Sequence, residues 1–178
     1  MRNSRHHLSN LPQQFAVAVT LLMMTVMTYA EEDATASQDP VSSTIAIVVH
    51  KDLPVDNLSL DDLRSIFLAD QQFWPDRTRI TLLVRAAQSE ERTFVLDRIY
   101  EMSEAQFRKY WIAKMFRAEV PRGPKIVLSA GMALDLVVAI PGSISFTSAD
   151  SVTDSVKVVR VDGLLPGDAG YPLSPEAN

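Results

Sequence analysis

The run from Thr44 to His50 (TIAIVVH) constrains the fold of this chain more than any other feature. It is continuously apolar and largely β-branched, without the alternation of a strand that has one face in solvent, so it predicts a strand covered on both faces. Strand patterns recur at 79–84, 143–146 and 155–161, and helix patterns lie at 59–68, 90–100, 103–117 and 129–139. Strands that alternate with helices predict an α/β layer fold.

The predicted helices begin at serines. Ser59 is followed three residues later by Asp62, and Ser103 by Gln106, which is the spacing of a capping box. The expected core residues are large and apolar: Phe67, Trp74, Phe94, Trp111 and Ile144, with Phe107, Tyr110 and Met115 on the inner face of the helix over 103–117.

The first thirty residues have the pattern of a secretory signal. Arg2 and Arg5 precede an apolar run over 15–27, and Thr28-Tyr29-Ala30 places small residues where a signal peptidase reads. This predicts a cleavable signal peptide over 1–30 and a periplasmic protein. Two alternatives stay open: cleavage after Ala36, and an uncleaved membrane anchor.

The rest of the chain predicts one domain. Residues 31–43 are polar and read as a linker, and residues 44–163 are sufficient for one domain with a real core. Residues 164–178, which contain three prolines and two glycines, are expected to form a flexible tail.

Composition excludes several classes of function. Without Arg2 and Arg5 the chain keeps 15 basic residues against 22 acidic ones, a formal charge of −7, and no basic cluster suited to nucleic acid. There is no cysteine, and His50 is the one histidine after residue 30, so we expect neither a metal site nor a cofactor. No nucleophile or acid–base pair stands out, and an enzyme is therefore the least favoured class.

The segment Arg85 to Phe94 (RAAQSEERTF) follows a predicted strand and opens a predicted helix at Ser89. The first backbone N–H groups of a helix have no intrahelical partner, so an oxyanion between Arg85 and Ser89 would meet a guanidinium, a hydroxyl and free amides. Glu90 and Glu91 oppose this prediction, because carboxylates in the first turn satisfy the helix dipole and repel an anion.

Four segments together resemble a known family. They are Leu63 to Ala69 (LRSIFLA), Arg85 to Phe94, the pair Tyr110-Trp111, and Ile140 to Phe146 (IPGSISF). In this order they resemble the second lobe of the phosphate-binding proteins of phosphate ABC transporters, which belong to the type II periplasmic binding proteins. The family's segments read approximately I-Y-L-G-K, R-x-D-G-S-G-T and P-G-A-I-G-Y. The resemblance spans 44–163 and implies an α/β fold that corresponds to a single lobe.

The resemblance implies that the ligand-binding residues lie in the loop. Arg85 and Ser89 take the positions of the family's phosphate-contacting arginine and serine. Glu90 and Glu91 stand where the family has Gly-Thr, and Ala87-Gln88 replaces Asp-Gly. The expected ligand is inorganic phosphate or a related oxyanion, and the expected protein partner is an ABC transporter permease. The family's first lobe has no counterpart here, so a homodimer or another protein would have to supply the second wall of the site.

Two functions follow from these observations. The first is solute binding by a secreted lobe in connection with ABC-type phosphate transport. The second is an interaction module that has lost tight solute binding and docks another envelope protein. The remaining charged residues have plainer interpretations. Arg92, Arg98 and Arg108 are expected on solvated faces, with pairing of Arg92 to a first-turn glutamate as the alternative, and His50 is expected to be structural.

Overall fold

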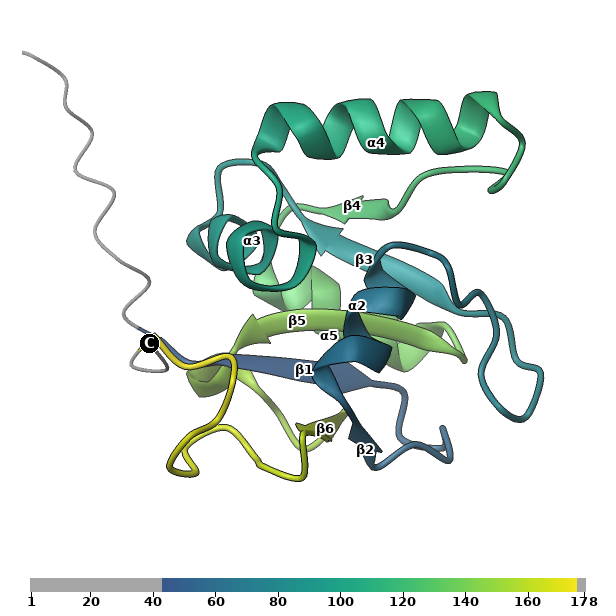
Figure 1. Cartoon of the computed structure of the whole chain (residues 1–178). Helices are drawn as coiled ribbons and strands as arrows, with labels where there is room; N and C mark the ends of the chain where they lie inside the picture. The colour runs from purple at the N-terminus through teal and green to yellow at the C-terminus, as the bar shows by residue number, and fades with distance from the viewer. Residues whose placement is uncertain (1–42, 176–178) are drawn as a thin grey trace, which may run out of the picture. The chain divides into compact units, whose positions relative to one another are not determined.

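A mixed six-stranded sheet forms the centre of the computed structural model, which describes residues 43–175 (Figure 1). The strands are β1 (Ile45–Val49), β2 (Asn57–Leu58), β3 (Thr81–Arg85), β4 (Lys125–Val127), β5 (Ser143–Ser148) and β6 (Lys157–Val161). Their order is β2-β6-β1-β5-β3-β4. Strand β3 runs parallel to β4 and β5, whereas β1 runs antiparallel to β5 and β6.

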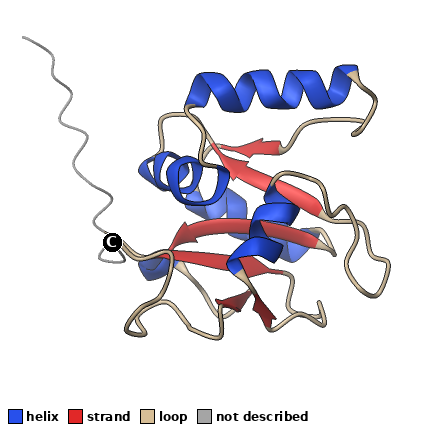
Figure 2. Cartoon of the chain, viewed as in Figure 1, coloured by secondary structure: helices blue, strands red, loops and turns tan. Residues whose placement is uncertain are grey.

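Helices cover both faces of this sheet (Figure 2). On one face pack α2 (Leu60–Phe67), α3 (Glu90–Val95) and α4 (Glu104–Phe116), and on the other packs α5 (Ala130–Ala139). Strand β1 contributes to both cores: Ile45, Ile47 and Val49 face the first layer, and Ala46 and Val48 face α5. All five residues are fully buried, which confirms the expected doubly covered strand.

The predicted helix starts are confirmed. The Ser59 side chain accepts a hydrogen bond from Asp62 N while the Asp62 side chain accepts one from Ser59 N, and Ser103 and Gln106 form the same capping box. The Ser59 hydroxyl also holds the pKa of Asp62 below its usual value. Beyond Val95, α3 widens into a π-helical turn, η1 (Leu96–Tyr100), and ends at Glu101 with φ 53°.

Some local details differ from the predictions. Strands β2 and β4 are two and three residues long, too short for a periodic pattern to reveal them. Met115 was expected to face the core, but its side chain is 41% exposed. The core residues Phe67, Trp74, Trp111 and Ile144 are buried as expected, and Phe94 is partly buried against them.

The C-terminal segment is part of the core, and the prediction of a flexible tail from residue 164 is wrong as far as Pro175, the last described residue. Tyr171 and Leu173 are fully buried. The Tyr171 hydroxyl donates to Ile45 O at 2.9 Å, and Ile45 N donates to Leu173 O at 2.9 Å. This segment packs along the start of β1 as irregular chain. Its prolines and glycines are typical of turns and give no helix or strand period, so the sequence pattern does not predict its burial.

The predicted signal peptide over 1–30 and nearly all of the predicted linker over 31–43 lie outside the described residues. Within 43–175, none of the helices has the length and apolar character needed to cross a bilayer.

Candidate functional site

The Arg85–Ser89 loop begins where β3 ends. Ala86 N donates to Val127 O at 2.9 Å, which ties the loop to the end of the parallel strand β4. Ser89 N then donates to Ala86 O at 3.0 Å, so the chain turns tightly before α3 begins. The Ser89 hydroxyl accepts a hydrogen bond from Arg92 N at 3.2 Å, as expected of an N-cap residue.

The guanidinium of Arg85 is buried and poorly satisfied. The residue is 8% exposed, and its Nε and Nη1 atoms are buried without a hydrogen-bond partner among the described residues. Its Nη2 atom lies 3.6 Å from Glu91 Oε1, an ionic contact that is too long for a hydrogen bond. A buried N–H without an acceptor costs roughly 1–3 kcal/mol, so this group is suited to an added acceptor.

Thr147 is a second buried polar group at this edge, which the sequence analysis missed. Thr147 is fully buried, and its Oγ1 atom has no hydrogen-bond partner among the described residues. Strand β5 pairs with β3 through Thr81 with Ser143 and Leu82 with Ile144. Arg85 and Thr147 lie beyond these paired residues, each toward the C-terminal end of its strand, and because side chains alternate along a strand, both point toward the α5 layer.

Two helices begin at the same edge of the sheet. Helix α3 starts after β3 with Ser89 as its N-cap, and α5 starts after β4 with Ser129, whose hydroxyl accepts from Met132 N at 3.1 Å. The N-terminal turns of both helices carry partial positive charge. At α3 that charge is offset by Glu90, which is exposed, and by Glu91, whose side chain is 17% exposed.

Arg92 fixes the end of β3 in place. Its Nη1 donates to Arg85 O at 2.7 Å, and its Nε and Nη2 each donate to the Glu104 carboxylate at 2.9 Å. Its Cζ lies 4.6 Å from the centre of the Phe107 ring. Arg92 is only 4% exposed, so the prediction of a solvated face is wrong.

A signal for the burial of Arg92 is present in the sequence. Arg92 shares the stripe of Val95, Leu96 and Ile99, which are all buried. A residue at this spacing points to the same face of the helix, so a charged side chain there must find a buried partner. The partner, Glu104, lies in the next helix, and no local pattern identifies it.

The four predicted ligand-binding residues therefore have different surroundings. Arg85 and Glu91 lie together, Ser89 caps α3, and Glu90 faces solvent.

His50 has the structural surroundings expected of it, because its Nδ1 accepts a hydrogen bond from Asp52 N at 3.2 Å. Nowhere in residues 43–175 do three His, Asp or Glu side chains gather in a group that could hold a metal ion.

Comparison with solved structures identifies the fold. An ABC-type phosphate transport receptor from Vibrio cholerae matches with a TM-score of 0.59 and 21% identity, over 74% of this chain and 53% of the receptor. A phosphate ABC transporter substrate-binding protein with bound phosphate from Clostridium perfringens matches with a TM-score of 0.56 and 21% identity, over 72% and 49% of the two chains. The fold is that of one lobe of a type II periplasmic binding protein.

PstS from Borrelia burgdorferi matches in the same way, with a TM-score of 0.57 and 14% identity, over 74% of this chain and 54% of PstS. This chain thus spans about half the length of the structures that it matches. No family model matches it. The expected fold and its resemblance to phosphate ABC transporter binding proteins are confirmed at the level of structure.

Proposed function

We propose that this protein binds phosphate or a related oxyanion at the Arg85–Ser89 loop, in connection with ABC-type phosphate transport. One observation carries the proposal: Arg85 and Thr147, toward the C-terminal ends of two neighbouring parallel strands, both hold buried polar atoms without partners among the described residues. An oxyanion accepts hydrogen bonds from a guanidinium, from a hydroxyl and from the amides that begin a helix. The structural likeness to phosphate receptors supports this choice of ligand.

Glu91 competes with the ligand. Glu91 Oε1 lies 3.6 Å from Arg85 Nη2, so an anion that binds this guanidinium meets a carboxylate already beside it. Binding then requires the Glu91 carboxylate to move away or to be neutralised. We therefore expect weak phosphate affinity in the native protein, with Ser89 and the amides after it providing further contacts.

A second wall completes the site. A small ion needs contacts on both sides to be well enclosed, and a single lobe supplies one side. We propose that a second copy of this chain or an envelope protein, such as a transporter permease, covers the loop. Phosphate affinity should then rise with protein concentration, or on addition of the partner.

The first thirty residues bear on where the protein acts. We propose that the chain is exported to the periplasm and cleaved after Ala30, because its first thirty residues have the signal pattern described above. N-terminal sequencing of protein from the envelope fraction should give a start at Glu31, or at Ser37 after cleavage at the later site. A start at Met1 would contradict cleavage and favour an anchored form.

Phosphate titration followed by amide NMR tests the binding proposal. Shifts are expected at Ser89 to Thr93, with saturation in the millimolar range. Arg85→Gln should weaken binding by about tenfold or more, because a charge-assisted hydrogen bond contributes roughly 1.5–3 kcal/mol. Thr147→Val, which keeps the shape and removes the hydroxyl, should weaken it less. Arg108→Gln, an exposed cation on α4, is the matched control and should change nothing.

A specific surface favours the second function, docking to another envelope protein. The outer side of α4 exposes Ile112, Met115 and Phe116, at 63%, 41% and 91%. Three large apolar side chains within five residues of one helix form a patch of the kind that protein interfaces use. This function predicts no phosphate binding in the native protein, and loss of a crosslinked partner in Phe116→Ser.

A further inference from the structure

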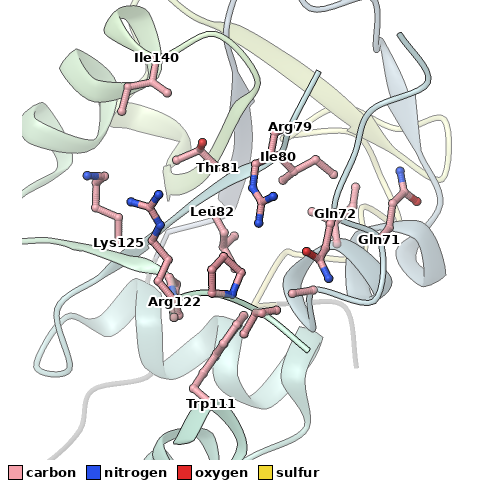
Figure 3. Close-up of a pocket in the computed structure, with 16 residues that line it drawn as sticks. Gln71, Gln72, Arg79, Ile80, Thr81, Leu82, Trp111, Arg122, Lys125 and Ile140 are labelled. Carbon is pink, nitrogen blue, oxygen red and sulfur yellow. The ribbon is translucent and has the colours of Figure 1, made fainter. Parts of the chain in front are cut away.

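A cavity of about 280 Å³ lies at the opposite end of β3 from the Arg85–Ser89 loop (Figure 3). It is bounded by the starts of β3 and β4, at Thr81 and Lys125, and by the chain that leads into each strand. Arg85 lies four positions after Thr81, which corresponds to about 13 Å along a strand. The cavity is therefore a separate place from the proposed phosphate site.

The rim of the cavity is cationic. Arg79, Arg122 and Lys125 line it, and its lining residues include no aspartate or glutamate. Among the described residues, none of these three cations has an ion-pair partner, although Arg79 Cζ lies 5.6 Å from the centre of the Phe73 ring. Three unpaired cations around one cavity are unusual in a chain with a net charge of −5.

The cations lie on two sides of the space. Figure 3 shows Arg79 and Gln72 on one side and Arg122 and Lys125 on the other, with Trp111 at one end. Gln72 Nε2 donates to Glu119 O at 3.1 Å, which holds this side chain in place and leaves its amide oxygen as an acceptor. Cations that approach from opposite sides raise the local potential more than a single charge does.

The wall of the cavity is apolar. Leu82, Trp111 and Val120 line it, and each is at least nine-tenths buried. An apolar wall beneath a cationic rim suits a ligand that has an apolar body and an anionic group. A volume of about 280 Å³ lies just below the usual range for small-molecule sites, about 300–1,000 Å³, which favours a body the size of one aromatic ring or a short alkyl chain.

We propose that this cavity binds a small organic anion, in which a carboxylate or phosphate monoester is attached to an apolar group. The anionic group pairs with Arg79, Arg122 and Lys125, and the apolar group packs against Trp111 and Leu82. Arginine binds carboxylate and phosphate oxygens in a two-pronged geometry, so the two arginines carry most of the recognition. Inorganic phosphate has no apolar body and is a poor ligand for this cavity.

Amide NMR titration of the full chain with benzoate, phenyl phosphate and benzamide tests the proposal. Benzoate and phenyl phosphate should shift the amides of Ile80, Thr81, Leu82 and Gly123. Benzamide has nearly the same shape as benzoate but carries no charge, and it should bind at least about tenfold more weakly. Comparison of benzoate with phenyl phosphate shows which anionic group the rim prefers.

Variants separate this cavity from the phosphate site. Arg79→Gln combined with Arg122→Gln should weaken benzoate binding by about tenfold or more and leave inorganic phosphate shifts at Ser89 unchanged. Arg85→Gln should weaken inorganic phosphate binding at the Arg85–Ser89 loop and leave benzoate binding in the cavity unchanged. Both arginines of the rim are exposed, so the double variant is expected to keep its native amide spectrum. Arg108→Gln is the control for loss of an exposed positive charge.

Three results would overturn the proposal. Equal affinities for benzoate and benzamide would show an apolar cavity without anion recognition. Benzoate shifts confined to residues 86–93 would assign the binding to the Arg85 loop. An absence of amide shifts with every probe at concentrations up to about 10 mM would show that the cavity does not bind anions of this size.

Discussion

Arg92 donates to both carboxylate oxygens of Glu104 at 2.9 Å, and this pair joins the helix after the Arg85 loop to the start of α4. The same guanidinium donates to Arg85 O at 2.7 Å. One buried arginine therefore sets both the end of β3 and the position of α3. The proposed phosphate site depends on it without using it as a ligand.

Loss of the Glu104 carboxylate should be costly. Glu104→Gln removes the charge opposite a guanidinium that is 4% exposed, and a hydrogen bond to a charged group contributes roughly 1.5–3 kcal/mol. We expect the free energy of unfolding, measured by urea denaturation, to fall by this amount. The matched control is Glu101→Gln, because Glu101 pairs with Arg64 at the surface and such pairs contribute below about 1 kcal/mol. Equal losses in the two variants would contradict the structural role of Arg92.

Two buried tyrosines should respond oppositely to loss of their hydroxyl groups. Tyr171→Phe removes a hydrogen bond to Ile45 O and should destabilise the fold by about 1 kcal/mol. The Tyr100 hydroxyl is buried without a partner among the described residues, so Tyr100→Phe should leave the free energy of unfolding unchanged or raise it by about 1 kcal/mol. Chemical denaturation of both variants checks this. A greater loss from Tyr100→Phe than from Tyr171→Phe is the contrary result.

The same tyrosines predict instability in alkali. Burial raises the pKa of both the Tyr100 and Tyr171 hydroxyl groups above the usual value of 10.0. Below pH 10 both groups are protonated in the folded and unfolded states, and their contribution to stability is constant. Above pH 10 the unfolded chain releases these protons first, so the free energy of unfolding falls as pH rises. Urea unfolding between pH 8 and about 11 should show this fall, and the double phenylalanine variant should show less of it.

The C-terminal segment should be needed for stability. Leu173 is fully buried, so Leu173→Ala should lower the free energy of unfolding by about 2–5 kcal/mol. Leu128, which is 72% exposed, provides the control, and Leu128→Ala should change it by less than about 0.5 kcal/mol. Similar small losses in both variants would return residues 164–175 to the flexible tail that the sequence suggests.

The helices were the most predictable part of this fold. Ser59 and Ser103 mark helix starts by local hydrogen bonding, and a capping box needs only residues that are three positions apart. Strand β1 was also predictable, because burial on both faces leaves a continuous apolar run. Strands β2 and β4 were not, since two or three residues carry no period and these strands are defined by their neighbours.

The candidate site was predictable only in part. Arg85 and Ser89 follow from a strand end and a helix start, both of which are local patterns. Thr147 lies on β5, and the parallel pairing of β5 with β3 that brings the two strands together is a long-range relationship. The pairing of Arg92 with Glu104 and the packing of Tyr171 against β1 are also contacts between distant segments, so periodicity and capping signals cannot reveal them.

Replacement of Glu91 tests the central claim most directly. If an oxyanion binds the guanidinium of Arg85, Glu91→Gln removes the competing charge 3.6 Å from Nη2 and should tighten phosphate binding by about fivefold, which corresponds to about 1 kcal/mol. Replacing Glu90 and Glu91 by Gly and Thr, the residues at these positions in the phosphate-binding proteins that the loop resembles, should tighten phosphate binding further. The control Glu101→Gln should leave phosphate binding unchanged. Phosphate titrations by calorimetry and amide NMR give these affinities. An absence of heat and of shifts at Ser89 to Thr93, in the native protein and in both variants, would contradict solute binding and favour docking through α4.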